Sequence, residues 1–523
     1  MANPGYCVKN NIYETWKNWE AVNLEGMKEI GYALSGCNQR FLNFVVFEGE
    51  KVSVNNFYFI AHPYNLELPV LCRVFRIQPY NPEMELGRTG PLAGKKRRKA
   101  DYGKKLEYII GFAEILGYYD KGGKWRQMEV APRPWDSVYE PTEDSLRQFL
   151  LCQQFAQNAL VVEIGKVRGT SIPVYLDLNA IARTHTFVAG MTRSGKSSFI
   201  INLVRASSNL KPRPRFVIFD RRGEYGALMK YGAEVIPYTE FMPAITNPDV
   251  IVGKLELKRT EKEVVLSAVR MLIEEGESIN REALYKKAEK VAETKASDKT
   301  RTKTLENIKW ALDNKGAFID REKKPLDIIS QIRKTPITVV DYSVDTDIEA
   351  QQRTATHIIN HIKDYAMAQR SKGDFACIIA VEEAQYLAPE KGAEVKESSA
   401  QGEAKAAFIE AISQAGGYNV GLIVMTQRPA YVAKSVISQC NSVVCFRLKS
   451  GNDQEAIMNY TEYGSERLAE YLPGLADHEA MLWGMAIPTP FPLIAEMDVK
   501  EYPQKAAAFA KQAWERMEEK VEG

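Results

Sequence analysis

The 523-residue sequence has few cysteines, almost no net charge and no long apolar run. Its seven cysteines stand singly and form no C-x-x-C pair, so we expect a reduced, intracellular protein without a zinc site. The formal net charge is only +2, so any contact with nucleic acid must come from local patches. A bilayer span needs roughly 18 apolar residues, and the N-terminus lacks the apolar core of a signal peptide. We therefore expect a cytoplasmic protein with no membrane segment.

The clearest motif lies in residues 185–204, which read as an apolar strand, a glycine-bounded loop and a helix. Residues 190–197 fit the phosphate-binding pattern G-x-x-x-x-G-K-[ST] without a mismatch. Glycines let the backbone amides approach phosphate oxygens, and the helix N-terminus adds its positive dipole end. We expect Lys196 to contact the β- and γ-phosphates and the Ser197 hydroxyl to ligate Mg²⁺. The loop residues predicted to bind ATP are Gly190, Met191, Thr192, Arg193, Ser194, Gly195, Lys196, Ser197 and Ser198.

The chain combines two kinds of sequence. Residues 1–172 contain short apolar or alternating runs separated by turn residues, which predicts an N-terminal small β-barrel or sandwich. Residues 173–500 alternate strand and helix signals, with a last strand at 442–448, so we expect an α/β domain with a parallel sheet covered on both faces. Residues from about 254 to 333 predict a helical insertion, and 501–523 read as a C-terminal helical tail.

Acidic residues end two of the predicted strands. The apolar run 376–381 stops abruptly at two glutamates. We assign Glu382 to the Mg²⁺ shell, partly through water, and Glu383 to polarising the water that attacks the γ-phosphate. Asp220 also ends an apolar strand, and with Glu224 it is a candidate for contacts around the metal or its waters. A turn-forming aspartate is the alternative for Asp220.

Three further polar residues are candidates for catalysis. Gln427 follows an apolar strand and has the reach to sense the γ-phosphate. Arg428 and Arg447 lie at or near strand ends, where a cation neutralises transition-state charge in its own subunit or in a neighbour's site. A structural ion pair is the alternative for each arginine.

With these motifs, the chain resembles the HerA-type translocases of the HerA/FtsK branch of P-loop ATPases. The resemblance implies a RecA-like P-loop core behind a HerA-type barrel, with ATP and Mg²⁺ as cofactors. It also implies a homo-oligomer, a hexameric ring that threads double-stranded DNA, with a NurA-like partner nuclease or another effector docking on the barrel. The segments that carry the resemblance are 164–166, 176–178, 190–198, 220–225, 381–384, 426–429, 438–441 and 446–448, followed by Asp453.

Three features bear on how far the resemblance extends. The basic loop Lys95–Lys99 is either a solvated loop or a contact to phosphates or a partner. Arg193 stands where relatives usually have glycine. Residues 414–419 replace a Gly-Arg-Lys segment of the family, so either Arg428, Arg447 or Arg193 acts across the subunit boundary, or activation by the neighbour is weaker.

The sequence therefore predicts an ATP hydrolase that acts as a DNA-dependent, double-stranded DNA translocase. Its partner effector would place it in DNA end processing or antiviral defence. Two alternatives stay open: a DNA-packaging or transfer ATPase with the same core, and a nucleotide-gated scaffold ring that presents an effector with little motor activity. The sequence leaves open the partner, the direction of translocation, the ring size and an archaeal, bacterial or viral origin.

Overall fold

A computed structural model describes residues 22–82, 107–151, 159–243, 248–277, 279–295, 298–316, 319, 325–392, 399–461 and 470–503. The basic loop Lys95–Lys99 and the tail from residue 504 onward lie outside the described residues. The chain divides into two units. The first comprises Met1–Pro214, Gly421–Ala430 and Ile437–Pro503, and the second comprises Arg215–Val420, Tyr431–Val436 and Gln504–Gly523.

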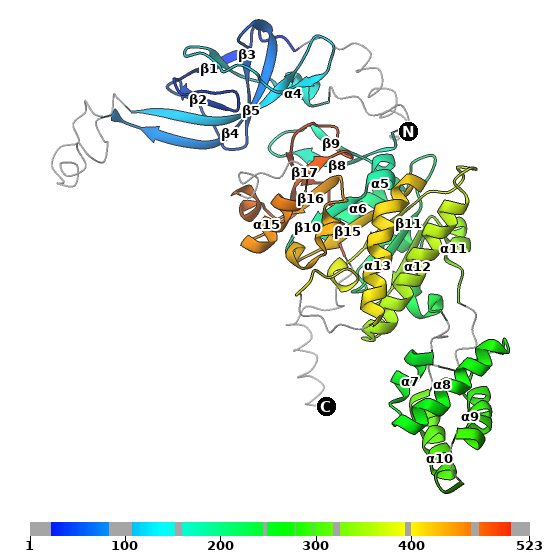
Figure 1. Ribbon diagram of the computed structural model, residues 1–523. Coiled ribbons are helices and arrows are strands. Elements are labelled where there is room, and N and C mark those ends of the chain that lie inside the picture. Colours follow the sequence, from blue (N-terminus) through cyan, green and yellow to red (C-terminus); the bar gives the residue numbers. More distant parts are fainter. Residues whose placement is uncertain are drawn as a thin grey trace, which may run out of the picture. The chain divides into compact units, whose positions relative to one another are not determined.

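The first unit begins with an antiparallel β-barrel, drawn blue to cyan in Figure 1. Its strands run in the order β2-β1-β7-β3-β4-β5-β6, and the additional pairing of β2 with β5 closes the ring. Alternate residues of β2 are buried, among them Leu42 and Phe44, because successive side chains of a strand point to opposite faces. The predicted N-terminal barrel is confirmed. The strands are β1 (Lys28–Ala33), β2 (Phe41–Val46), β3 (Phe57–His62), β4 (Asn65–Tyr80), β5 (Tyr108–Tyr119), β6 (Trp125–Arg126) and β7 (Ser137–Glu140).

A second sheet region in the first unit holds the phosphate-binding motif. Its strands are β8 (Val161–Val167), β9 (Pro173–Asp177), β10 (Thr186–Ala189), β15 (Val420–Thr426), β16 (Ser442–Phe446), β17 (Glu479–Gly484) and β18 (Leu493–Met497). Strand β10 lies between β15 and β16 and is parallel to both. The associated helices are α4 (Glu143–Leu150), α5 (Leu178–Thr184), α6 (Lys196–Ser207) and α15 (Gly451–Tyr460), with a short 3₁₀ turn η8 (Leu472–Gly474). The 3₁₀ turn η7 (Pro429–Tyr431) and helix α14 (Lys434–Ile437) lie where the chain passes from the first unit to the second and back.

The prediction that the last strand lies at 442–448 is wrong, because β17 and β18 follow it. Strand β17 is antiparallel to β16 and to β18, and β18 is antiparallel to β8. The sheet is therefore mixed, and its parallel part ends at β16. The missed strands are short and flank the proline-rich segment 488–492, which reads as a loop. A short connection without a helix allows only antiparallel pairing.

Aromatic rings and one buried arginine join the barrel to the segment before β18. Arg73 of β4 is only 2% exposed, and its Nη1 donates to the Pro492 carbonyl at 2.5 Å. Its Nε donates to the Glu114 carboxylate at 2.6 Å. The rings of Trp125 and Phe491 lie 5.3 Å apart, centroid to centroid. The barrel is thus tied to this part of the sheet by both apolar and charged contacts.

The second unit contains parallel strands in the order β12-β13-β11-β14. All residues of β11 and β14 are buried, as expected for strands covered on both faces. Because parallel strands end at the same edge, Asp220 at the end of β11 and Glu382 just after β14 lie at one edge. The elements are β11 (Phe216–Asp220), β12 (Ala233–Pro237), β13 (Ile337–Asp341), β14 (Cys377–Val381), α11 (Ile328–Lys334), α12 (Ile348–Ala368), α13 (Ser399–Gln414), η2 (Tyr225–Tyr231), η3 (Tyr238–Phe241), η5 (Ala384–Tyr386) and η6 (Ala415–Tyr418).

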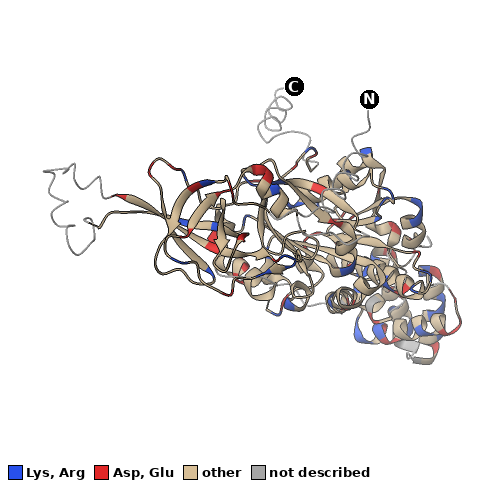
Figure 2. Cartoon of the chain, turned by 90° about the horizontal axis from the view of Figure 1, so that it is seen from above, with Lys and Arg blue, Asp and Glu red and all other residues tan. Residues whose placement is uncertain are grey.

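The predicted helical insertion is confirmed and begins slightly earlier than expected. It comprises α7 (Pro248–Leu255), α8 (Arg259–Glu274), α9 (Arg281–Lys295) and α10 (Asp298–Lys315), drawn green in Figure 1. These helices share their own apolar core, and we call them the helical lobe. Figure 2 shows basic and acidic residues interspersed along the chain, in line with its small net charge. None of the helices described is both long and apolar enough to cross a membrane.

We expect Arg73→Ala to lower the free energy of unfolding by about 3 kcal/mol, because it leaves a part-buried carboxylate and a carbonyl without their partner. Arg126→Ala is the matched control, since that arginine is 55% exposed in its ion pair with Asp120 and should cost less than about 1 kcal/mol. Urea denaturation of both variants tests this. Equal losses would mean that the Arg73 contacts contribute no more than a surface pair.

Candidate functional site

Strand β10 leads directly into the phosphate-binding loop, and α6 begins at Lys196. A Cβ atom on Gly190 would lie 2.6 Å from Cβ of Phe446 in the neighbouring strand β16, so only glycine fits there. Gly195 has φ +123°, and a Cβ there would lie 2.9 Å from Nδ1 of His478. Both motif glycines are therefore required by the surrounding chain as well as by an approaching phosphate.

The loop is held closed by its own hydrogen bonds. Nζ of Lys196 donates to the carbonyls of Gly190 at 2.6 Å and Met191 at 3.0 Å. The buried Ser194 hydroxyl donates to the same Met191 carbonyl at 2.8 Å. The backbone N–H of His478 donates to the Ser194 carbonyl at 3.0 Å. The lysine thus lies across the concave side of the loop, where it can transfer its bonds to phosphate oxygens.

Ser197 and Ser198 occupy the first turn of α6. Ser198 is buried, whereas Ser197 is partly exposed. Gln427, just beyond the end of β15, is brought against the loop, and its Oε1 accepts from Oγ1 of Thr192 at 2.5 Å. Because β15 is parallel to β10, the two strands end at the same edge, which explains why the predicted sensor meets the loop.

Arg193 adopts a backbone conformation that favours glycine. Its φ is +64°, in the left-handed region. That conformation costs an ordinary residue roughly 1–2 kcal/mol and costs glycine almost nothing. Glycine would therefore fit this position without strain, and the Arg193 side chain is exposed.

The two arginines predicted near strand ends are both paired. The guanidinium of Arg447 donates to the Leu475 carbonyl at 3.2 Å and to the Asp477 carboxylate at 2.5 Å. Its carbonyl accepts the N–H of Met191, so it supports the loop backbone. Nε of Arg428 lies 3.5 Å from the carboxylate of the buried Asp453. These contacts fit the ion-pair alternative for both arginines.

In the second unit, Asp220 organises the turn after β11. Its carboxylate accepts the backbone N–H groups of Arg222 and Glu224 at 3.1 Å and that of Tyr225 at 3.0 Å. Asp220 is 1% exposed, and burial raises its pKa. The contacts are those of a turn-forming aspartate that also places its charge near Glu382.

Glu382 is a buried carboxyl whose surroundings disfavour ionisation. Its Oε1 accepts the Tyr225 hydroxyl at 3.0 Å, and its Oε2 accepts the Arg221 N–H at 3.2 Å. Burial, reinforced by the charges of Asp220 and Glu224, raises its pKa to about 8. A divalent cation would reverse this, because it stabilises the carboxylate that burial disfavours.

Glu383 has both carboxylate oxygens engaged. Oε1 accepts from Nη2 of Arg222 at 2.7 Å, and Oε2 accepts from Nε2 of Gln385 at 2.8 Å. The residue itself has φ +49° and ψ +51°, a left-handed conformation that is uncommon outside glycine and is concentrated at functional sites. Its side chain is thereby directed by two donors from its own unit.

Sequence reasoning missed several residues that direct these side chains. Arg222, Tyr225 and Gln385 each contact one of the two glutamates, and His478 contacts the phosphate-binding loop. Arg222 and Tyr225 lie inside the family segment 220–225, which was the available signal for them. His478 carried no signal, because it reaches the loop from a distant turn.

The residues present fit Mg²⁺ by the chemistry of their donors. The Ser197 hydroxyl and the Glu382 carboxylate are oxygen ligands of the kind that this hard cation prefers. Glu382 is buried near Asp220 and Glu224, and a bound cation would offset the repulsion among these carboxylates.

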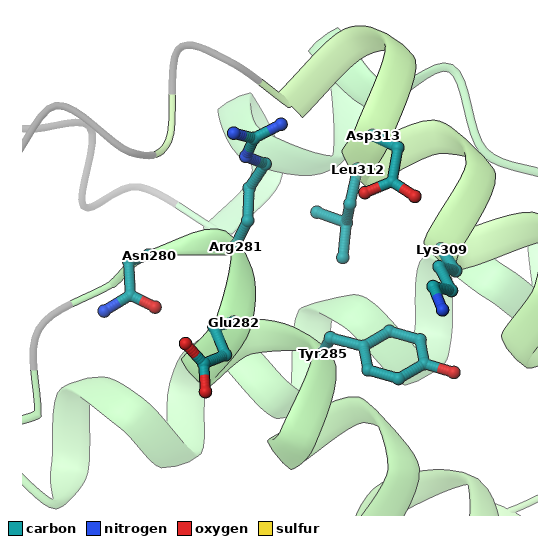
Figure 3. A pocket seen from close by; sticks show the side chains of 7 residues that line it. All are labelled: Asn280, Arg281, Glu282, Tyr285, Lys309, Leu312 and Asp313. Atoms are coloured by element: carbon teal, nitrogen blue, oxygen red, sulfur yellow. The ribbon is translucent and has the colours of Figure 1, made fainter.

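A separate hollow lies in the helical lobe, between α9 and α10, and Figure 3 shows its lining. Two cations, Arg281 and Lys309, and two acids, Glu282 and Asp313, share it. None of the predicted site residues lies there. With balanced charges and no buried polar group directed into it, this hollow is not a candidate for the nucleotide site.

Comparison with known proteins agrees with the resemblance read from the motifs. Residues 162–362 match the family model of the helicase HerA central domain. The DNA double-strand break repair helicase HerA of Sulfurisphaera tokodaii is 23% identical over 420 residues, which is 75% of this chain and 79% of that protein. HerA of Pyrococcus furiosus is 22% identical over 471 residues, or 78% and 81% of the two chains.

Among solved structures, VirB4 of Thermoanaerobacter pseudethanolicus aligns with a TM-score of 0.45 at 16% identity, covering 66% of this chain and 98% of that one. The predicted resemblance to HerA-type ATPases and the predicted class, a P-loop ATP hydrolase, are confirmed.

We expect Arg193→Gly to bind ATP within about twofold of the wild type, because glycine adopts the left-handed conformation without strain. Arg193→Val should weaken binding about tenfold, because a β-branched residue is strained there. Isothermal titration with ATP and Mg²⁺ measures both. If the glycine variant loses as much affinity as the valine variant, the Arg193 side chain itself contributes to binding.

We expect the contribution of Glu382 to the free energy of unfolding to decrease as the pH rises. The folded chain keeps its proton up to a pKa of about 8, whereas the unfolded chain releases it near about 4.3. Between these values the folded state binds more protons, so this group's contribution decreases by up to about 1.4 kcal/mol per pH unit. The Glu382→Gln variant lacks this proton, so its stability relative to the wild type should grow from pH 5 to pH 8 and then level off.

Denaturation midpoints at each pH measure that difference. Glu455→Gln, an exposed glutamate on α15, serves as the matched control. A difference between Glu382→Gln and wild type that stays flat across this range would show that Glu382 is already ionised in the folded chain.

Proposed function

We propose that this protein is an ATP-driven motor that translocates double-stranded DNA in the cytoplasm, as a HerA-like ring. The observation that carries the proposal is a complete phosphate-binding loop within a segment that matches the HerA central domain. Relatives named as DNA double-strand break repair helicases support the choice of DNA as the substrate on which the motor acts.

In this proposal the P-loop and the two glutamates act on the same ATP. Lys196 moves from the loop carbonyls to the β- and γ-phosphates, while the loop amides stabilise charge that develops there. Ser197 and Glu382 would hold Mg²⁺, which neutralises phosphate charge when bound. The Thr192–Gln427 hydrogen bond places the amide of Gln427 beside the loop, where it can respond to the γ-phosphate.

Glu383 would orient the attacking water and accept its proton. Its two present donors, Arg222 and Gln385, keep the carboxylate in a defined direction within its own unit. One oxygen must exchange a donor for the water before it can act as a base. The Arg222 side chain is 43% exposed in this ion pair. Of the two donors, Arg222 can therefore leave Glu383 more easily, for example to bind a protein or DNA surface.

We further propose a hexameric ring with a partner nuclease or another effector on the barrel, in DNA end processing or defence. The barrel offers large exposed side chains for such a partner, with Tyr64 72%, Leu66 71% and Trp135 77% exposed. Trp135 is held at φ +76°, an uncommon conformation for a bulky residue. The guanidinium of Arg133 lies 5.7 Å from the Tyr64 ring centre and adds a charged edge.

Two other functions use the same residues. A DNA-packaging or transfer ATPase would share the whole ATP site and differ in its partner. A nucleotide-gated scaffold ring would bind ATP and hydrolyse it slowly, whether or not DNA is present. The complete set of Lys196, Ser197, Glu382 and Glu383 favours hydrolysis over the scaffold.

We expect linear duplex DNA to stimulate ATP hydrolysis by the wild type, and Glu383→Gln to reduce the stimulated kcat at least 100-fold, in line with the loss of a general base. ATP affinity should change little, since glutamine keeps the shape and one acceptor. Steady-state phosphate release with and without DNA measures the rates, and titration with ATP measures the affinity.

The matched control is Glu390→Gln, which changes a partly buried glutamate that lies seven residues further along the chain. Wild-type hydrolysis that is slow and indifferent to DNA would favour the scaffold. Full activity in Glu383→Gln would contradict the assignment of Glu383 as the base but would not contradict the proposal of a DNA-dependent motor.

A further inference from the structure

The chain that follows β18 is fastened along the phosphate-binding helix α6. Nη2 of Arg205 lies 3.6 Å from the Asp498 carboxylate, toward the end of the helix. One turn earlier, Oδ1 of Asn202 accepts the N–H groups of Lys500 at 2.9 Å and Glu501 at 3.1 Å. Nδ2 of Asn202 donates to the Glu501 carbonyl at 2.7 Å. We call residues 498–502 the strap.

The strap runs toward the end of α6 that faces the phosphates. Its contacts proceed from Arg205 to Asn202, and Asn202 also donates to the Ser198 carbonyl at 2.7 Å, in the first turn of the helix. Asn202 grips the strap through backbone atoms, so the position of the strap does not depend on the side chains of residues 500 and 501. The last residue of the strap, Tyr502, therefore lies near the end of α6 that faces the phosphates.

Tyr502 meets a histidine that already contacts the phosphate-binding loop. The two rings lie edge to face, with centroids 5.9 Å apart and planes at 73°. His478 has φ +66°, and its N–H donates to the Ser194 carbonyl at 3.0 Å. Its Nδ1 is the nearest atom to the position of a Cβ on Gly195, at 2.9 Å. Tyr502 remains 57% exposed, so one face of the ring is accessible.

We infer that Tyr502, supported by His478, binds the base of the nucleotide. The inference rests on the proposed ATP site, because the triphosphate must lie on the loop and the first turn of α6. Beyond the α-phosphate the nucleoside needs a surface near the start of α6, and in this inference the end of the strap provides it. A planar base needs an aromatic or apolar surface there, and an accessible tyrosine ring supplies it without demanding a particular base.

The surrounding contacts favour this role over a merely structural one. An exposed tyrosine at the end of a strap gains little by burial, yet its neighbours are ordered by several hydrogen bonds on the preceding residues. His478 has a left-handed conformation, which costs energy and persists only because the surrounding contacts hold the residue there. Both features direct aromatic surface toward the entrance of the phosphate site.

The test distinguishes binding of the base from binding of the phosphates. Binding of ATP and of inorganic tripolyphosphate, each with Mg²⁺, is measured by titration for the wild type, Tyr502→Ala and Tyr502→Phe. We expect Tyr502→Ala to weaken ATP about tenfold, the loss typical of removing one stacked aromatic ring. Tripolyphosphate affinity should stay within twofold, and Tyr502→Phe should keep both affinities.

Trp310→Ala serves as the matched control, since this aromatic residue on α10 is similarly exposed at 59%. Equal weakening of ATP and tripolyphosphate by Tyr502→Ala would mean that the residue only supports the loop, and this would overturn the inference. No change in either affinity would overturn it as well. Failure of the proposed ATP site looks different, because the wild type itself would then bind neither ligand.

Discussion

A phosphate-binding loop works only if its backbone amides keep facing inward, and this chain secures that from several sides. The loop is packed so closely against β16 that a Cβ on Gly190 would collide with Phe446. Lys196 and Ser194 bond to carbonyls of the loop itself. The loop is therefore formed by the fold before any phosphate arrives. Preorganisation of this kind is what makes fixed amides effective against developing charge, because they need no reorganisation during the reaction.

The acidic residues of the second unit are under a different constraint. Their carboxyl groups are buried, which disfavours the negative charge that binding a cation requires. Asp220 accepts bonds from three backbone N–H groups, and Glu382 accepts bonds from the Tyr225 hydroxyl and the Arg221 N–H, which favour the charged carboxylates. For Glu382 these bonds do not offset the cost of burial, and its pKa stays high. A cation and an acidic residue of this kind depend on each other, because each lowers the cost of placing the other in a poorly solvated site.

The parts of the molecule that could be predicted are those written in local patterns. Continuous apolar runs predicted the buried parallel strands, and the glycine spacing predicted the phosphate-binding loop. The position of two acids directly after an apolar run singled out Glu382 and Glu383. The antiparallel strands β17 and β18 were missed, because a short strand beside a proline-rich loop is defined by its partner rather than by its own sequence. The Arg222–Glu383 pair spans 161 residues, Thr192–Gln427 spans 235, and Asn202–Glu501 spans 299. No single-sequence pattern specifies contacts over such separations.

In the ring that we propose, residues 414–419 limit which arginine could serve a neighbouring subunit. There the chain forms a 3₁₀ turn that ends at Asn419 with φ +59°, a compact entry into β15 that carries no cation. Of the three remaining arginines, Arg447 is bound to Leu475 and Asp477 and supports the loop backbone, so moving it would cost contacts that the loop needs. The Arg428 side chain is 54% exposed, with Nε 3.5 Å from the Asp453 carboxylate, and Arg193 is exposed on the loop. A group that acts across a boundary must be able to leave its own subunit's contacts, and by that criterion Arg428 and Arg193 qualify and Arg447 does not.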